Sequence, residues 1–228
     1  MGTGAVRRDR PSDWRAVLFD LDGTLADSVP LILHCFRHTM LKHLGRKLPD
    51  ELWIGKIGLP LRTSMAEFAA DQAETERMVT TYTEFQKTVH DDMVGSFPEA
   101  GDTLAALRSR GVPVGIVTSK GREMTERTLA QCGFGDLAVL VTVDDVVCGK
   151  PDPEPVTKAL TLLGLGESAR DVLFVGDSTY DMVAGRDAGV RTAGALWGPY
   201  SRADLEGTEP DYWVEDFAAV LALRPCEY

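Results

Sequence analysis

Cysteine is scarce in this 228-residue sequence, which holds only four. None of them form the Cys-x-x-Cys spacing that is typical of zinc sites and redox pairs, and their positions fit no disulfide framework. The sequence therefore predicts neither a zinc centre nor a disulfide-rich fold. Reduced thiols in a cytoplasmic protein are the simplest interpretation of these residues, which are Cys35, Cys132, Cys148 and Cys226.

Long hydrophobic runs are absent as well. No stretch reaches the roughly 18 consecutive apolar residues that a transmembrane helix requires, so we expect no membrane span. Arg7, Arg8 and Arg10 stand near the N-terminus without an apolar segment behind them, so we also expect no secretory signal. Residues 1–13 are expected to form a flexible N-terminal arm.

Positive charge is in deficit. The chain has 24 Lys and Arg against 35 Asp and Glu, which gives a net charge of −11. A surface of this sign repels nucleic acid and anionic lipid, so we expect neither as a partner. An anionic small substrate would need a local basic pocket. Hydrophobic residues make up 44% of the chain, enough for a sizeable core in one large domain or two small ones.

Two carboxylates follow the first apolar run of the chain. Ala16–Phe19 is long enough for a buried strand and too short for a helix. Asp20 and Asp22 lie two residues apart just behind it, so on an extended chain their side chains point the same way. A bound cation would remove their mutual repulsion, and a hard ion such as Mg²⁺ suits carboxylate oxygens. The alternative interpretation is a strand end with two solvated acids.

The remainder of the chain alternates between predicted strands and helices. After a stretch without strands at 27–92, apolar runs at 112–117, 139–143, 171–175 and 192–196 are separated by helical segments. This alternation predicts a parallel sheet with helices on both faces. The helical stretch at 27–92 leaves the sheet after its first strand and returns there, so we expect a lid over the carboxyl ends of the strands.

Polar groups follow several of these strands, and their order resembles a known family. Asp20-Leu21-Asp22-Gly23-Thr24, Thr118-Ser119, Lys150-Pro151 and Gly176-Asp177-Ser178-Thr179-Tyr180-Asp181 match the motifs of the haloacid dehalogenase superfamily of phosphohydrolases. The resemblance implies an α/β fold with a Rossmann-like, doubly wound parallel sheet of strand order 3-2-1-4-5. It also implies a helical cap at 27–92, inserted into a core made of 14–26 and 93–228.

The resemblance also implies the roles of three residues in catalysis. Asp20 would be the nucleophile that forms an aspartyl-phosphate. Asp22 would protonate the leaving group and later activate water. Lys150 would bind the phosphoryl group and orient Asp20. Taken alone, Lys150 could equally be an ordinary surface lysine.

Ligand contacts follow from the same resemblance. Phosphoryl oxygens would be bound by Thr118, the amide of Ser119 and Lys150. Mg²⁺ would be held by the Asp20 carboxylate, the Asp22 backbone carbonyl, Asp177 and, directly or through water, Asp181. The separate alternatives are a helix-capping role for Thr118 and an ordinary first-turn acid at Asp181.

The function predicted first is a Mg²⁺-dependent phosphatase acting on a small phosphomonoester, phosphoglycolate-like or of the sugar-phosphate type, as a monomer or homodimer. An inorganic pyrophosphatase is the nearest alternative, because 141–146, 150–155 and 192–194 resemble that group. A phosphosugar mutase is less favoured, since Ile32 stands where the mutases resembled have histidine. A catalytically silent protein on this fold is disfavoured by the intact motif residues.

Substrate choice is expected to lie in the cap. The glycines of loop 55–60 allow a ligand to approach the backbone closely. Lys56 in this loop and Arg62 just behind it are predicted to contact the substrate. Solvated surface charge is the alternative interpretation of both residues.

Overall fold

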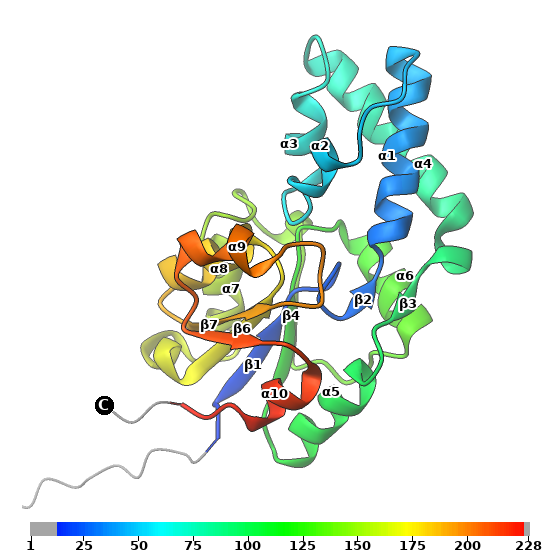
Figure 1. Cartoon of the computed structure of the whole chain (residues 1–228). Coiled ribbons are helices and arrows are strands. Elements are labelled where there is room, and N and C mark those ends of the chain that lie inside the picture. Colours follow the sequence, from blue (N-terminus) through cyan, green and yellow to red (C-terminus); the bar gives the residue numbers. More distant parts are fainter. Residues whose placement is uncertain (1–12, 226–228) are drawn as a thin grey trace, which may run out of the picture.

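A six-stranded parallel sheet forms the centre of the protein (Figure 1). The computed structural model describes residues 13–225, so the predicted flexible arm lies outside the described residues except for Asp13. The strand order is β5-β4-β1-β6-β7-β8, with β1 paired in parallel to both β4 and β6. The strands are β1 (Ala16–Phe19), β4 (Val114–Val117), β5 (Val139–Val141), β6 (Val172–Gly176), β7 (Arg191–Ala195) and β8 (Tyr212–Val214).

The predicted doubly wound order 3-2-1-4-5 is thereby confirmed, and β8 extends the sheet beyond β7 as a sixth strand. Because the strand order reverses on either side of β1, the residue that follows β1 lies at the switch point where ligands bind in such sheets.

Helices cover both faces of the sheet, and short 3₁₀ turns lie at 143–145, 166–171 and 206–208. These helices are α5 (Ala100–Ser109), α6 (Arg122–Cys132), α7 (Glu154–Leu162), α8 (Thr179–Asp187), α9 (Arg202–Leu205) and α10 (Phe217–Ala222). Within β1, Val17 and Phe19 are buried with residues of α5, α6 and α10, while Ala16 and Leu18 are buried with residues of α7 and α8. Because successive side chains of a strand point to opposite faces of the sheet, β1 contributes to the hydrophobic clusters on both faces.

The segment between β2 and β3 folds into four helices gathered at one end of the molecule (Figure 1). They are α1 (Val29–Leu44), α2 (Glu51–Ile54), α3 (Leu61–Ala66) and α4 (Gln72–Met93). They contribute most of a third hydrophobic cluster, which also includes Tyr200 and Leu205 and in which the rings of Phe36 and Trp53 stack with centroids 4.6 Å apart. A separate cluster supports the predicted division into cap and core, which we retain as a proposal.

A small antiparallel ribbon joins the two connections to these helices. It consists of β2 (Ala26–Asp27) and β3 (Gly95–Ser96), with Ala26 opposite Ser96. The sequence analysis predicted neither of these strands, because two residues give too short a pattern to recognise. The ribbon fixes where the chain leaves the core and where it returns.

No helix between residues 13 and 225 is both long and apolar enough to cross a membrane. Cys35, Cys132 and Cys148 are free thiols, and Cys226 lies outside the described residues.

Candidate active site

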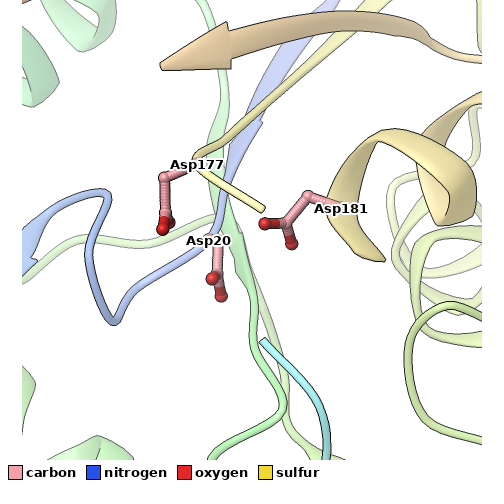
Figure 2. A group of neighbouring side chains, drawn as sticks. All are labelled: Asp20, Asp177 and Asp181. Atoms are coloured by element: carbon pink, nitrogen blue, oxygen red, sulfur yellow. The ribbon is translucent and has the colours of Figure 1, made fainter. Parts of the chain in front are cut away.

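Three buried carboxylates meet at the carboxyl ends of β1 and β6 (Figure 2). Asp20 follows β1, Asp177 follows β6, and Asp181 lies in the first turn of α8. One oxygen from each lies within 4.8 Å of the others, and none of the three side chains is more than 3% exposed. Because β1 and β6 are neighbouring parallel strands, their ends bring Asp20 close to Asp177 and Asp181, which lie more than 150 positions further along the chain.

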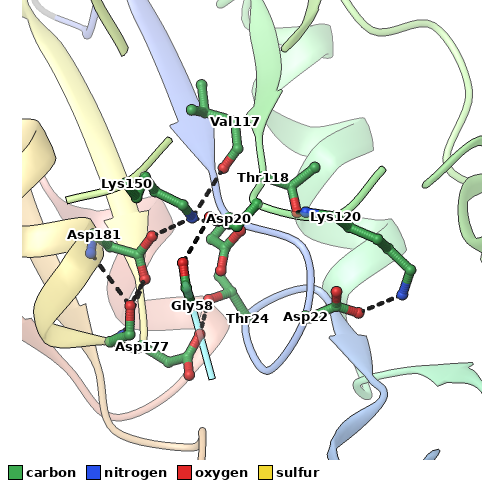
Figure 3. Close-up of polar contacts among 12 residues, drawn as sticks. Asp20, Asp22, Thr24, Gly58, Val117, Thr118, Lys120, Lys150, Asp177 and Asp181 are labelled. Carbon is green, nitrogen blue, oxygen red and sulfur yellow. Dashed lines mark hydrogen bonds and ion pairs between the residues drawn. The ribbon is translucent and has the colours of Figure 1, made fainter. Parts of the chain in front are cut away.

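Lys150 inserts one positive charge among these acids (Figure 3). Its Nζ lies 2.9 Å from Asp20 Oδ1 and 2.5 Å from Asp181 Oδ1, and it donates to the Val117 carbonyl at 3.3 Å. Only 1% of the residue is exposed. One lysine balances one of three carboxylates, so the cluster retains an excess of negative charge when all of them are ionised.

The pKa values reflect this burial. Burial raises the pKa of Asp20 to about 7, with Lys150 opposing the change and Asp181 adding to it. Burial likewise raises the pKa of Asp177 well above its ordinary value, with the charges of Asp181 and Asp20 contributing. Burial disfavours the charge of Lys150, but the carboxylates of Asp181 and Asp20 outweigh it and raise the pKa of Lys150. The acids therefore need a further cation to ionise together at neutral pH.

Asp177 carries the clearest sign of such a cation. Its Oδ1 accepts a hydrogen bond from Thr24 Oγ1 at 2.6 Å, whereas its Oδ2 is buried without a hydrogen-bond partner among the described residues. A Cβ built on Gly23, which has φ +85°, would lie 2.7 Å from that free oxygen. Three carboxylates with one unpartnered oxygen form an all-oxygen donor set, which fits a hard divalent ion such as Mg²⁺.

Asp22 faces away from the three-carboxylate cluster (Figure 3). Its Oδ1 accepts hydrogen bonds from Ser28 Oγ at 2.6 Å and from Lys120 Nζ at 2.7 Å. Ser28 occupies the N-cap position of α1, but its hydroxyl donates to Asp22 and caps no backbone amide of the helix. The side chain of Asp22 is thus held separately, and a metal contact through its backbone carbonyl stays a prediction.

Thr118 and Ser119 follow β4 beside Asp20. Thr118 is 3% exposed, and its hydroxyl accepts the Lys120 amide at 3.2 Å. Ser119 Oγ donates to the carbonyl of Gly58 at 2.6 Å, which ties the end of β4 to the cap loop. Both residues line the cavity, and their predicted contacts with a phosphoryl group stay predictions.

The cap loop 55–60 rests directly on the core. Besides the Ser119 bond, the Tyr180 hydroxyl donates to the Gly55 carbonyl at 2.8 Å, and the Tyr200 hydroxyl donates to the Ile57 carbonyl at 2.9 Å. The two tyrosines were missed at the sequence level, because nothing in their local pattern indicates a partner more than 120 residues away. These hydrogen bonds hold loop 55–60 against the core, above the carboxylates.

A cavity of about 630 Å³ lies between the cap, including loop 55–60, and the core. Asp20, Asp22 and Thr118 line its core side, and both predicted specificity residues line its cap side. Lys56 forms an ion pair with Glu67 at 2.5 Å, and Arg62 pairs with Glu76. Both cations are thus partnered within the cap, and their contact with a substrate stays a prediction.

Comparison with known proteins identifies the family. The model of the haloacid dehalogenase-like hydrolase family matches residues 17–195, which is most of the chain. The chain belongs to this family. The predicted membership and the prediction of a hydrolase are therefore confirmed.

Relatives of this haloacid dehalogenase-like hydrolase include pyrophosphatase PpaX from Bacillus cereus, 36% identical over 91% of the chain and 94% of the relative. A hydrolase from Pseudomonas syringae has a similar structure, with a TM-score of 0.81 at 26% identity over 91% of this chain and 96% of that one. A predicted phosphoglycolate phosphatase from Haemophilus somnus shares the fold at 24% identity, with a TM-score of 0.81 over 92% and 97% of the two chains.

Glycine at position 198 leaves room for Asp177. A Cβ on Gly198 would lie 2.5 Å from the Asp177 Cβ, so Gly198→Ala is expected to displace that carboxylate. We expect a loss of about tenfold or more in kcat/KM at limiting Mg²⁺, recovered in part at higher Mg²⁺. Gly101→Ala in α5 is the control, because a Cβ there meets no atom within 4 Å. Equal activity of both variants would contradict the expectation.

The raised pKa of Asp20 predicts a pH dependence of stability in metal-free protein. A carboxyl with pKa near 7 when folded and 3.8 when unfolded stabilises the fold fully below the unfolded value. This stabilisation is lost as pH rises through about 7. In urea unfolding with a chelator, the free energy of unfolding of the wild type should therefore fall between about pH 5 and pH 8. This decrease should be smaller in Asp20→Asn. If the free energy of unfolding depended on pH equally in both proteins, the prediction would be contradicted.

Proposed function

We propose that this haloacid dehalogenase-like phosphatase hydrolyses a small phosphomonoester, depends on Mg²⁺, and forms an aspartyl-phosphate on Asp20. The observation that carries the proposal is the convergence of Asp20, Lys150, Asp177 and Asp181 beside the cavity between cap and core. The cytoplasmic location, the oligomeric state and the details of the residue roles remain predictions that accompany it.

Asp20, Asp177 and Asp181 would hold the metal ion. When bound, Mg²⁺ supplies positive charge that reduces the repulsion between an anionic carboxylate and an anionic phosphoryl group. The unpartnered Oδ2 of Asp177 supports this assignment. Lys150 adds a fixed positive charge at 2.9 Å from Asp20 Oδ1.

The two-step reaction uses Asp20 and Asp22 in turn. In the first step a carboxylate oxygen of Asp20 attacks phosphorus, the bond from phosphorus to the ester oxygen breaks, and Asp22 donates a proton to the departing alcohol. In the second step water attacks phosphorus, gives its proton to Asp22, and the bond to Asp20 breaks to release phosphate. Ser28 and Lys120 both bind Asp22 Oδ1, which holds the carboxyl in place and leaves Oδ2 for the proton.

The residues that follow β4 would position the phosphoryl group. We propose that the Thr118 hydroxyl and the Ser119 amide donate to its oxygens, together with Lys150. Negative charge spreads over these oxygens in the transition state, so donors held in fixed positions are most effective there. The Ser119 hydroxyl is already engaged by Gly58, which leaves its amide for the ligand.

Charge pairing in the cap favours a phosphomonoester over pyrophosphate. The distal half of pyrophosphate is itself a phosphate and requires cations of its own. Lys56 and Arg62 are each paired with a glutamate, and Lys120 is paired with Asp22. Pyrophosphate hydrolysis is the second candidate, because relatives 35 to 36% identical to this chain carry the name pyrophosphatase.

Mutase activity has less support. Ile32 lines the cavity at the position where the sugar-phosphate mutases that the sequence resembles carry histidine. An alkyl side chain cannot exchange a proton with a bound sugar, so a hydrolytic outcome is favoured.

The test is an assay of purified protein with Mg²⁺ on phosphomonoesters and on pyrophosphate, with phosphate release as the readout. We expect turnover of at least one small monoester with kcat/KM at least about tenfold above that for pyrophosphate. A higher value for pyrophosphate would favour the second candidate. No phosphate release from any compound would overturn the proposal.

A further inference from the structure

We propose that Tyr82 and Gln86 of α4 determine specificity by hydrogen bonding a polyhydroxyl leaving group. This inference rests on the proposed function and extends it to the class of ester: a phosphorylated sugar or polyol.

Both side chains are buried and polar, and both lack partners. Tyr82 is 4% exposed and Gln86 is 5% exposed, and each lines the cavity. Neither side chain makes a hydrogen bond within residues 13–225. Their polar atoms are not sealed off from the cavity, so the Tyr82 hydroxyl and the Gln86 amide are open to water or a ligand there.

The other buried polar residues of α4 differ in this respect. Thr75 donates to the Asp71 carbonyl, and His90 lies between Asp91 and Thr128 at 2.8 Å from an oxygen of each. Structural polar groups in this helix are therefore satisfied by the protein. The two that are not satisfied are the two that line the cavity.

The position of the pair suits a leaving group. Residues four apart lie on one face of a helix, so Tyr82 and Gln86 face the cavity from the same side of α4. The Tyr82 ring stacks on Trp53 with centroids 6.1 Å apart, which limits its movement. Asp20 and Asp22 line the same cavity from the core, so a phosphoryl group at Asp20 directs the remainder of the ester toward the cap.

The chemistry of the pair indicates which leaving group fits. A phenol and a carboxamide are neutral, and each can both donate and accept a hydrogen bond. The cations around the cavity are already paired, including Lys87 with Glu123 at 3.0 Å. Hydroxyl groups match neutral donors and acceptors, whereas a second anionic group would need free positive charge. A polyol or sugar is therefore favoured over a second phosphate or a carboxylate.

The test uses Tyr82→Phe and Gln86→Met, which remove the hydrogen-bonding groups and keep most of the side-chain volume. Kinetics are measured with glycerol phosphate and a hexose phosphate, and with methyl phosphate and p-nitrophenyl phosphate as esters without hydroxyls. For the better polyol ester we expect each variant to lose about tenfold in kcat/KM, with less than about twofold change for the hydroxyl-free esters.

Thr83→Val is the matched control. Thr83 also lies on α4 and lines the cavity, but its hydroxyl already donates to the Val79 carbonyl at 2.9 Å. We expect its kinetics to match the wild type for every ester. The melting temperatures of Tyr82→Phe and Gln86→Met in the absence of ligand should stay close to that of the wild type, because neither change removes a side-chain hydrogen bond between described residues.

Three results would overturn the inference: an unchanged kcat/KM for polyol esters in both variants, an equal loss for all four esters, or a wild type that does not prefer polyol esters. A wild type that hydrolyses none of the esters would overturn the proposed function instead. The inference is then decided by binding: glycerol phosphate should raise the melting temperature of the wild type and not that of Gln86→Met, and equal shifts would overturn it.

Discussion

Replacing Asp20 with asparagine is expected to lower phosphatase turnover by at least about a thousandfold while the protein stays folded. An asparagine oxygen is not a competent nucleophile toward phosphorus, although it fills the same volume and can still accept a hydrogen bond from Lys150. The substitution also removes one of three clustered carboxylates, so it relieves repulsion in the metal-free protein. Initial rates with saturating ester and Mg²⁺, together with a melting curve, measure both effects.

Asp102→Asn provides the control for that experiment. Asp102 is exposed in the first turn of α5, on an element that supplies no group to the site. Its variant should retain wild-type rates. Near wild-type turnover in Asp20→Asn, with the melting temperature maintained, would remove Asp20 from the mechanism.

Removal of divalent metal is expected to abolish turnover, and added Mg²⁺ is expected to restore it. The physical reason is the excess negative charge around Lys150 and the buried, unpartnered Oδ2 of Asp177. A metal bound only by the folded state also stabilises it, by about 2.7 kcal/mol when its concentration is a hundred times its dissociation constant. Melting curves of chelated protein titrated with Mg²⁺ should therefore shift upward.

Asp177→Asn separates this metal effect from nonspecific salt effects. The variant should lose at least about a hundredfold in turnover and most of the Mg²⁺-dependent rise in melting temperature, because amide nitrogen cannot replace the free oxygen as a ligand. Asp102→Asn should retain both. Full activity after exhaustive chelation, or an equal Mg²⁺ shift in Asp177→Asn, would contradict a metal site at these residues.

Local patterns were sufficient to predict the sheet and the position of the carboxylates. Short apolar runs indicated the strands, and the rule that parallel strands share one carboxyl edge placed Asp20 near Asp177 without coordinates. The resemblance to the family added the strand order and the pairing of Lys150 with Asp20. The structure has this pairing at 2.9 Å.

Contacts within the cap could not be predicted in the same way. Lys56 and Arg62 were expected to serve the substrate, and the structure pairs them with Glu67 and Glu76, which come from other parts of the helical segment. Such pairs depend on how helices pack, and a helix's sequence records which face is apolar but not which neighbour it meets.

The environment of Asp22 shows the same limit. Lys120 stood in the sequence beside Thr118 and Ser119, but its ion pair with Asp22 joins residues 98 positions apart. Tyr82 and Gln86 read as ordinary positions of an amphipathic helix. What marks them is that both side chains line the cavity without a protein partner, and that is a property of the folded state.

The most direct test of Asp20 as nucleophile is a rapid acid quench of wild-type enzyme with excess ester and Mg²⁺, at times shorter than one turnover, followed by mass spectrometry of its peptides. We expect one phosphoryl group on the peptide that contains Asp20, lost on treatment with hydroxylamine as an acyl phosphate should be, and none in Asp20→Asn. A phosphoryl group on another residue, or phosphate release without any phosphorylated enzyme at these times, would contradict the account.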